Sequence, residues 1–226
     1  MKAMILAAGE GRRLEPLSLK TPKPLLRVAG KPLIQYHIEA LVKANIEELV
    51  INLSHLGEQI ESQLSNGSMW GASIHYSHED ELLETGGGIL NALHLLGDEP
   101  FVVVNGDIFT DYDFSKLPGG LPEDVLGHLV MVDNPIQHAE GDYGFTGDTV
   151  GEFALLSSAP SRRLTYSGIG MLRPELLLQH RPGMFPLREV FAAAIESRKL
   201  SGEYYGGVWT DVGTVDRLEA LRQSLQ

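Results

Sequence analysis

The first 14 residues constrain the fold more than any other part of the chain. Lys2 to Ala8 is a short, mostly apolar run, which is typical of a central strand in a parallel sheet. It leads directly into Gly9-Glu10-Gly11, where the missing Cβ atoms let backbone N–H groups approach an anion. A buried strand that ends in such a loop predicts an α/β protein with an anion-binding edge.

The rest of the first half alternates between amphipathic helices and buried strands. Helical spacing runs from Pro32 to Val42, and Pro100 to Val104 is a continuous apolar strand that leads into Asp107. Between them we predict a strand over 48–53, a helix over 55–64, a strand over 73–77 and a helix over 89–96. This order predicts a doubly wound, mostly parallel, Rossmann-like sheet with its ligands at the carboxyl ends of the strands. The opening loop and Asp107 would then share one edge.

The second half has a looser pattern. The stretch 134–163 is rich in Gly, Ser and other polar residues. Regular elements are predicted as a strand over 125–133, a helix over 187–195, a short strand over 207–209 and a closing helix over 215–225. Because no repeat or linker divides the chain, residues 1–226 are predicted to form a single domain.

Composition and charge exclude several classes of protein. The net charge of −12 disfavours nucleic acid and anionic membranes as partners. Without cysteine, an apolar signal-peptide core or a run of roughly 18 apolar residues, the chain is expected to be cytoplasmic and not to enter a membrane. Residues 1–31 nevertheless carry seven Lys or Arg against two Glu, a local +5 that leaves −17 for the remainder. This region suits a small, highly charged anion, with a solvated basic face as the alternative.

Two common phosphate-binding motifs do not fit the opening loop. A dinucleotide fingerprint needs a third glycine at position 14, which is Leu14, and an acidic residue at the end of the second strand, which is absent. A P-loop needs a Gly-Lys pair followed by Ser or Thr, which is also absent. The eight histidines have no metal-ligand spacing, and no Ser-His-Asp arrangement indicates a hydrolase.

The ordered motifs from Leu6 to Leu33 resemble the signature of the sugar-1-phosphate nucleotidyltransferases. They read Leu6-Ala7-Ala8-Gly9-x-Gly11-x-Arg13-Leu14, Pro16-Leu17, Pro22-Lys23-Pro24-Leu25 and Gly30-Lys31-Pro32-Leu33. The resemblance implies a GT-A-like fold in which the catalytic cations Arg13 and Lys23 contact a nucleoside triphosphate and stabilise charge as pyrophosphate leaves. A guanidinium and an ammonium group suit that role. The implied nucleotide-binding residues are Ala8, Gly9, Gly11, Arg12, Arg13, Lys23, Glu79, Gly87 and Asn105. Arg12 departs from the small hydroxyl residue that is common there.

Two aspartates complete the implied site. Asp107 follows a continuous apolar strand, and Asp211 lies in Trp209-Thr210-Asp211-Val212-Gly213-Thr214. The resemblance implies that both bind Mg²⁺, which prefers hard oxygen ligands and keeps several waters. Read alone, each aspartate could equally be a turn residue or a helix cap.

The base is expected near Tyr76-Ser77-His78-Glu79 and Thr85-Gly86-Gly87-Gly88. The resemblance places Glu79 where related thymidylyl- and uridylyltransferases have a glutamine. A carboxylate accepts the N3–H of uracil or thymine and repels the N3 lone pair of cytosine, so UTP or dTTP is favoured. The alternative is that Glu79 belongs to a solvated acidic loop.

The whole chain resembles one branch of the family, the bacterial N-acetylmuramate α-1-phosphate uridylyltransferases of cell-wall recycling. The motifs that carry this resemblance lie at 83–88, 104–107, 133–135, 141–143 and 165–170. It implies a nucleotide-binding half over 1–110 and a sugar-phosphate-binding half over 111–226, with UTP and a sugar 1-phosphate as ligands. Candidate sugar contacts are Asn105, Asp142, Tyr143, Ser167 and Gly168. We expect a monomer or a weak homo-oligomer.

Two other functions stay open. One is a uridylyl-, thymidylyl- or guanylyltransferase that acts on a hexose 1-phosphate, and the other is a non-catalytic nucleotide-sugar sensor on the same fold. A complete set of phosphate-binding cations and metal ligands counts against the sensor. Because the acceptor phosphate is already an anion, nucleotidyl transfer needs no general base, and the sequence offers none.

Overall fold

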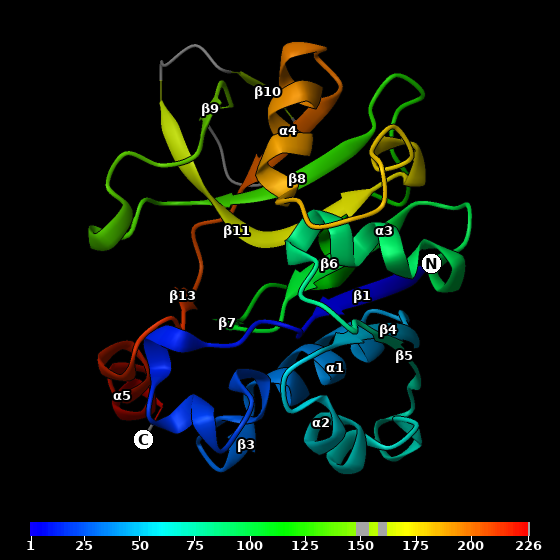
Figure 1. The fold of residues 1–226 in the computed structure, drawn as a ribbon. Coiled ribbons are helices and arrows are strands. Elements are labelled where there is room, and N and C mark those ends of the chain that lie inside the picture. The colour runs from blue at the N-terminus through cyan, green and yellow to red at the C-terminus, as the bar shows by residue number, and fades with distance from the viewer. Residues whose placement is uncertain (148–153, 158–161, 226) are drawn as a thin grey trace.

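A nine-stranded mixed sheet forms the centre of the protein in the computed structural model, which describes residues 1–147, 154–157 and 162–225 (Figure 1). The strands lie in the order β5-β4-β1-β6-β11-β8-β12-β10-β9. Their bounds are β1 Lys2–Leu6, β4 Glu48–Leu53, β5 Ser73–His78, β6 Phe101–Asn105, β8 Gly127–Val132, β9 Tyr143–Phe145, β10 Ala154–Ser157, β11 Arg163–Leu172 and β12 Leu200–Tyr204.

The first four strands in this order are parallel, as the sequence predicts. Helices α1 (Leu33–Lys43) and α2 (Gly57–Leu64) pack apolar side chains on the face that contains Ile5. Helices α3 (Glu84–Leu96) and α4 (Leu187–Glu196) cover the opposite face, which contains Met4 (Figure 1). Because apolar side chains are buried on both faces, β1, β4 and β6 have no polar alternation, and the doubly wound interpretation is confirmed.

The register of these strands places polar residues at one edge. Leu6 is paired with Asn52 of β4 on one side and with Asn105 of β6 on the other. All three residues lie at the carboxyl ends of their strands, beside the opening loop. The sheet therefore presents its ligand-binding edge where the sequence predicts it.

The second half of the sheet combines parallel and antiparallel pairs. β11 is antiparallel to both β6 and β8, with an irregularity in its pairing with β8 between Tyr166 and Gly170, and β12 is parallel to β8. The first half of the sheet is thus wholly parallel, and the second half is mixed. β11 was not predicted because the alternation of polar and apolar residues in Arg163–Leu172 breaks at Gly168 and resumes in the other phase.

A two-stranded ribbon joins the two halves of the chain beside this edge. β7 (Ile108–Thr110) is antiparallel to β13 (Trp209–Asp211), and Ile108 is paired with Asp211. Helix α5 (Val215–Ser224) follows and packs with the opening segment around Leu14. A second small ribbon pairs β2 (Arg27–Val28) with β3 (Lys31–Pro32). The 3₁₀ turns are η1 Arg12–Leu14, η2 Leu17–Leu19, η3 Lys23–Leu25, η4 Ser68–Trp70, η5 Phe114–Lys116, η6 Ile136–His138 and η7 Pro174–Leu176.

Several boundaries and elements differ from the prediction. Helix α3 begins at Glu84 and includes the triple glycine, whereas the sequence predicts its start at Ile89. The short strand near Trp209 covers 209–211 and not 207–209. η6, β9 and β10 lie within the stretch 134–163, where no element was expected. In the described part of the chain, no helix is both long enough and apolar enough to cross a membrane.

Candidate active site

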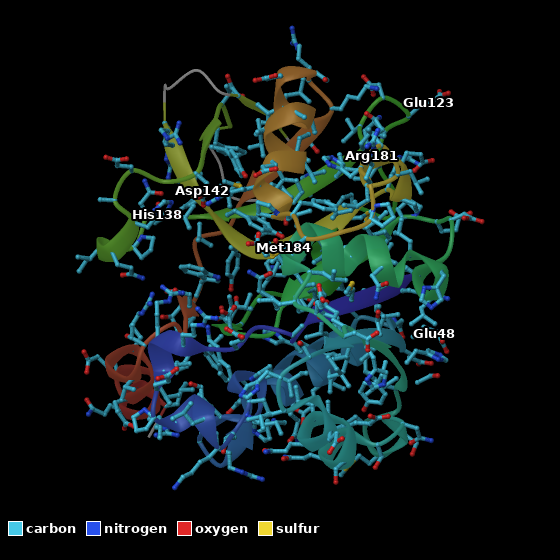
Figure 2. The ribbon with its side chains drawn as sticks, in the orientation of Figure 1. Glu48, Glu123, His138, Asp142, Arg181 and Met184 are labelled. Atoms are coloured by element: carbon cyan, nitrogen blue, oxygen red, sulfur yellow. The ribbon has the colours of Figure 1, made fainter. Side chains whose placement is uncertain are left out.

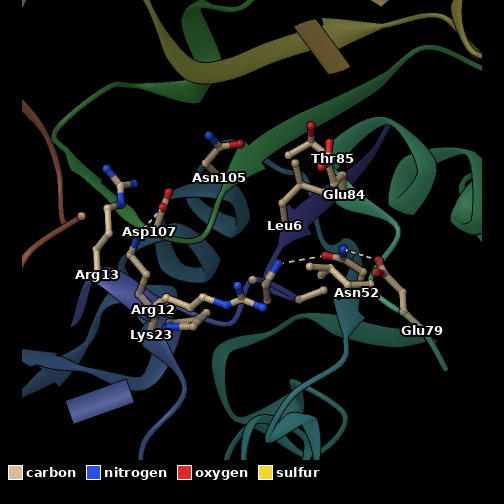
Figure 3. Close-up of a pocket in the computed structure, with 17 residues that line it drawn as sticks. Leu6, Arg12, Arg13, Lys23, Asn52, Glu79, Glu84, Thr85, Asn105 and Asp107 are labelled. Carbon is tan, nitrogen blue, oxygen red and sulfur yellow. Dashed lines mark hydrogen bonds and ion pairs between the residues drawn. The ribbon is translucent and has the colours of Figure 1, made fainter. Parts of the chain in front are cut away.

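The opening loop lines a cavity of about 420 Å³ at the carboxyl edge of the parallel strands. Figure 3 shows the side chains of Arg12, Arg13 and Lys23 on one side of it and those of Glu84 and Thr85 on the other. The predicted nucleotide residues that line this cavity are Ala8, Gly9, Gly11, Arg12, Arg13, Lys23, Glu79 and Asn105. Residues far apart in the chain are therefore brought together around one space, as the sequence predicts.

A second cavity of about 370 Å³ adjoins the first. Its lining includes Arg13, Asn105 and Asp107, which also line the first cavity. The remaining wall is made by Ile108, by Pro135, Gln137 and His138, by 165–167 and by residues of β13 and α5. Two ligands bound in these cavities would meet at the shared residues.

Lys23 and Asp107 form an ion pair at this junction (Figure 3). The Lys23 residue is only 8% exposed, so its ammonium is held in place and poorly solvated. The Nζ atom contacts Oδ2 of Asp107. The backbone carbonyl of Asp107 accepts a hydrogen bond from the N–H of Val212 at 2.8 Å, which fixes the aspartate to the segment that follows β13.

A buried histidine supports the same segment. His37 of α1 lies with Nε2 2.9 Å from the carbonyl oxygen of Ile108. Burial lowers the pKa of His37 to about 4, so the ring is neutral at pH 7 and donates this hydrogen bond. The neutral imidazole of His37 therefore fixes the backbone of β7, which begins directly after Asp107.

Asp211 faces the second cavity from β13. Its Oδ1 accepts hydrogen bonds from Nε2 of Gln137 at 3.0 Å and from Nη1 of Arg217. Because β7 pairs with β13, Asp211 lies opposite Ile108. Ile108 is the residue that follows Asp107 in the chain. The second cavity thus has both predicted carboxylates in its lining.

The two carboxylates fit a hard divalent cation with few protein ligands. Each has one oxygen bound to a cationic side chain, and no described residue hydrogen-bonds to Oδ1 of Asp107 or Oδ2 of Asp211. The described residues contain no group of three or more His, Cys, Asp or Glu that could form a complete protein cage. Two free carboxylate oxygens, with waters and ligand phosphates as the other donors, match the preference of Mg²⁺.

Asn52 is a site residue that the sequence analysis missed. Its Oδ1 accepts the N–H of Ala7 at 2.8 Å, and its Nδ2 donates to Oε1 of Glu79 at 2.7 Å (Figure 3). The other oxygen of Glu79 accepts the N–H of Leu83 at 3.0 Å. Glu79 is 7% exposed, so the solvated-loop interpretation is wrong for this residue. A polar Asn within the apolar run 49–53 was the available signal.

The triple glycine packs against this network and against residues 183–185. A Cβ on Gly88 would lie 2.6 Å from Oε1 of Glu79, and one on Gly87 would lie 2.1 Å from the carbonyl oxygen of Gly183. Gly87 donates its N–H to the carbonyl of Phe185 at 3.1 Å. Gly87 is outside the linings of both cavities, so its role in the structure is close packing of α3, and Glu84 and Thr85 lie at the cavity instead.

Of the predicted sugar residues, Asn105 and Ser167 line the second cavity, whereas Asp142, Tyr143 and Gly168 do not. Asp142 accepts a hydrogen bond from Nε2 of His138 at 3.0 Å, and Figure 2 labels both side chains. Asp142 also accepts the N–H of Tyr166 at 2.8 Å, and His138 and Tyr166 both line the cavity. Asp142 therefore holds two residues of the second cavity's lining in place but does not line the cavity itself.

Tyr143 and Gly168 have packing roles. Tyr143 contacts the ring of Phe191 edge-on, and burial raises the pKa of Tyr143 to about 12. Gly168 has φ +87° and a Cβ there would lie 2.8 Å from the amide of Asn105. The polar and aromatic side chains of Gln137, His138, Trp209 and Arg217 are among the residues that line the second cavity and were not proposed from the sequence.

Comparison with known proteins agrees with this geometry. The family model described as Nucleotidyl transferase matches residues 2–151. The N-acetylmuramate alpha-1-phosphate uridylyltransferase of Neisseria meningitidis serogroup B is 45% identical, over 97% of this chain and 96% of that protein. The mannose-1-phosphate guanylyltransferase catalytic subunit beta of Danio rerio is 31% identical over 94% of this chain, which spans 61% of that longer protein.

Solved structures share the fold at low sequence identity. A putative glucose-1-phosphate thymidylyltransferase from Bacillus anthracis has a TM-score of 0.82 at 19% identity and covers 99% of this chain and 94% of its own. A UDP-glucose pyrophosphorylase has a TM-score of 0.80 at 19% identity, over 99% and 97%. The opening motif, the two adjoining cavities and the match over 2–151 lead to one conclusion. The chain belongs to the nucleotidyl transferase family.

Proposed function

We propose that the protein transfers UMP from UTP to N-acetylmuramate α-1-phosphate and releases UDP-N-acetylmuramate and pyrophosphate. The observation that carries this proposal is the pair of adjoining cavities that share Arg13, Asn105 and Asp107. One cavity suits the nucleotide and the other suits the sugar phosphate, so that the reacting phosphates meet at the shared residues. The choice of acceptor rests on the similarity to the Neisseria meningitidis uridylyltransferase.

The transfer is an in-line displacement at the α-phosphorus of UTP. A phosphate oxygen of the acceptor forms the new P–O bond, the bond from the α-phosphorus to the bridging oxygen breaks, and pyrophosphate leaves with the electron pair. The nucleophile is already an anion, so no proton has to be removed. Catalysis then consists of positioning and of electrostatic stabilisation of the leaving group.

Arg13 and Lys23 supply the fixed positive charge for this step. Arg13 lines both cavities, so its guanidinium can bind phosphate oxygens on either side of the reacting bond. Lys23 is buried and contacts Asp107, and the low local dielectric there strengthens the interaction of its ammonium group with phosphate. Gly9 and Gly11 have no side chains, so the triphosphate can approach the backbone at these two positions of the loop.

Asp107 and Asp211 are the residues that would hold Mg²⁺. When bound, the ion neutralises charge on the phosphates and orients them. Oδ1 of Asp107 and Oδ2 of Asp211 are the oxygens left available by the contacts with Lys23, Gln137 and Arg217.

Uracil is assigned to the part of the first cavity that contains Asn52 and Glu79. A carboxylate can accept about four hydrogen bonds, and Glu79 receives two from the chain itself. It can therefore also accept the N3–H of uracil, whereas cytosine would place a lone pair against it. This supports UTP over CTP, and the use of UTP supports a cytoplasmic location.

The proposal is tested by measuring pyrophosphate release in a matrix of substrates. UTP, dTTP, CTP and GTP are each combined with the 1-phosphates of N-acetylmuramate, N-acetylglucosamine, glucose and mannose, with Mg²⁺ present or chelated. We expect the highest kcat/KM for UTP with N-acetylmuramate α-1-phosphate and no release after chelation. Preference for another pair would indicate a hexose-1-phosphate enzyme, and no release with any pair would indicate a nucleotide-sugar sensor.

A further inference from the structure

Arg217 lies at the boundary between the two cavities. It is in the first turn of α5, and its side chain lines the second cavity. The neighbouring Gly213 lines the first cavity, and a Cβ on Gly213 would lie 2.3 Å from Nη2 of Arg217. The guanidinium therefore rests against the backbone of Gly213, where the acceptor phosphate has to approach the α-phosphate of the nucleotide.

The chain uses only part of this guanidinium. Nη1 donates to Oδ1 of Asp211, and Nε lies 3.3 Å from Oγ1 of Thr214. These contacts fix the plane of the group, and its side chain is 19% exposed. No described residue accepts a hydrogen bond from Nη2, which is left for a ligand.

The charges around the second cavity indicate which kind of ligand Nη2 of Arg217 would bind. The lining of this cavity contains the carboxylates of Asp107 and Asp211 and the guanidinium groups of Arg13 and Arg217, and Lys23 pairs with Asp107 from the first cavity, so the cations outnumber the carboxylates by one. A bound divalent cation adds two positive charges, which match the two negative charges of a sugar 1-phosphate. The acceptor phosphate thus requires a cation on its own side of the reacting bond, and Arg217 is in that position.

We propose that Arg217 binds the phosphate of the acceptor sugar 1-phosphate through Nη2 while Nη1 holds Asp211. This inference rests on the proposed nucleotidyl transfer. Arg217 then has two tasks: to orient a carboxylate ligand of the metal and to hold the nucleophilic phosphate beside it. A fixed bidentate group suits this better than lysine, because lysine offers one compact charge and not two separated donors.

The test compares R217Q and R217K with R222Q. Arg222 is a matched control because it lies on the same helix but bonds to Glu219 and to the carbonyl of Arg27, away from both cavities. Initial rates give the KM for the sugar 1-phosphate, the KM for UTP and the Mg²⁺ concentration at half-saturation. Calorimetry then measures binding of the sugar 1-phosphate in the presence of Mg²⁺ and α,β-methylene-UTP, which cannot transfer its nucleotidyl group.

We expect R217Q to raise the KM and the Kd for the sugar 1-phosphate about tenfold or more, the range for loss of a charged hydrogen bond. R217K should lie between R217Q and the wild type, and R222Q should match the wild type. The KM for UTP should change less than the KM for the sugar 1-phosphate in both Arg217 variants and should match the wild type in R222Q.

The inference is overturned if R217Q leaves acceptor binding unchanged and instead raises only the half-saturating Mg²⁺ concentration, because Arg217 would then only orient Asp211. If the wild type uses another sugar 1-phosphate, the proposed acceptor fails and the same comparison is made with that substrate. If it uses none, calorimetry with inorganic phosphate decides, and equal affinity of wild type and R217Q for phosphate overturns the inference.

Discussion

Substitution of Gly88 by alanine tests whether the Asn52–Glu79 network organises the nucleotide side of the site. Gly88 lies within α3, where alanine has a helix propensity about 1 kcal/mol more favourable than glycine. Propensity alone therefore predicts a more stable protein. The structure predicts the opposite, because the new Cβ would lie 2.6 Å from Oε1 of Glu79 and 3.0 Å from Nδ2 of Asn52.

The two effects can be compared in magnitude. Overpacking in a close-packed interior costs about 1–3 kcal/mol, and separating the buried Asn52 amide from the Glu79 carboxylate costs about 1–3 kcal/mol more. Together these outweigh the gain of about 1 kcal/mol in propensity, so G88A should lower the free energy of unfolding by about 1–5 kcal/mol. Asn52 also holds the N–H of Ala7 at the start of the loop, so the KM for UTP should rise several-fold.

Urea unfolding gives the stability, and initial rates with varied UTP give the KM. Gly119→Ala is the matched control, because no atom lies within 4 Å of a Cβ at that position. G119A should stay within about 1 kcal/mol of the wild type. A G88A protein as stable as the wild type with an unchanged KM for UTP would refute the role assigned to this network.

Three further predictions concern the cations, the acceptor wall and acid stability. Lys23→Ala should reduce turnover on the order of 100-fold, about 3 kcal/mol in the transition state, in a pyrophosphate-release assay, and near-normal turnover would contradict its role. Asp142→Ala should raise the KM for the sugar 1-phosphate several-fold without changing that for UTP, because His138 and the N–H of Tyr166 lose their acceptor. Burial lowers the pKa of both His37 and His128 to about 4. Between pH 6.5 and 4 these two histidines are therefore protonated in the unfolded chain and neutral in the folded chain. The free energy of unfolding should therefore fall between pH 6.5 and 4 by about 2–3 kcal/mol per histidine, and a flat urea-stability profile over that range would contradict the assignment.

The parallel half of the fold could be predicted from the sequence because its signals are local. β4 occupies Glu48–Leu53, the range predicted from its apolar run, and α1 begins directly after Pro32. The start of α3 could not be predicted in this way, because three consecutive glycines oppose helix formation. Its first turn is instead stabilised by tertiary contacts: the N–H groups of Gly86 and Gly87 both donate to the carbonyl of Phe185.

The antiparallel half gave weaker signals for a physical reason. β11 has small residues at Ser167, Gly168 and Gly170, and Gly168 has a positive φ against the side chain of Asn105. Such a segment lacks the continuous apolar run that marks a buried parallel strand. It forms a strand because β6 and β8 pair with it on both sides, and this pairing is not encoded in its own periodicity.

The same distinction separates the two sides of the site. The nucleotide side is made largely by one continuous loop, so its residue types and spacing could be interpreted before the fold was known. The acceptor side is assembled from η6, β11, β13 and α5, and its contacts depend on the pairing of β7 with β13. Arg217 acquires its position only because that ribbon places Asp211 beside it and Gly213 leaves room for its guanidinium. Acceptor choice in this chain should therefore change through substitutions on these four elements, while the opening loop continues to determine the reaction.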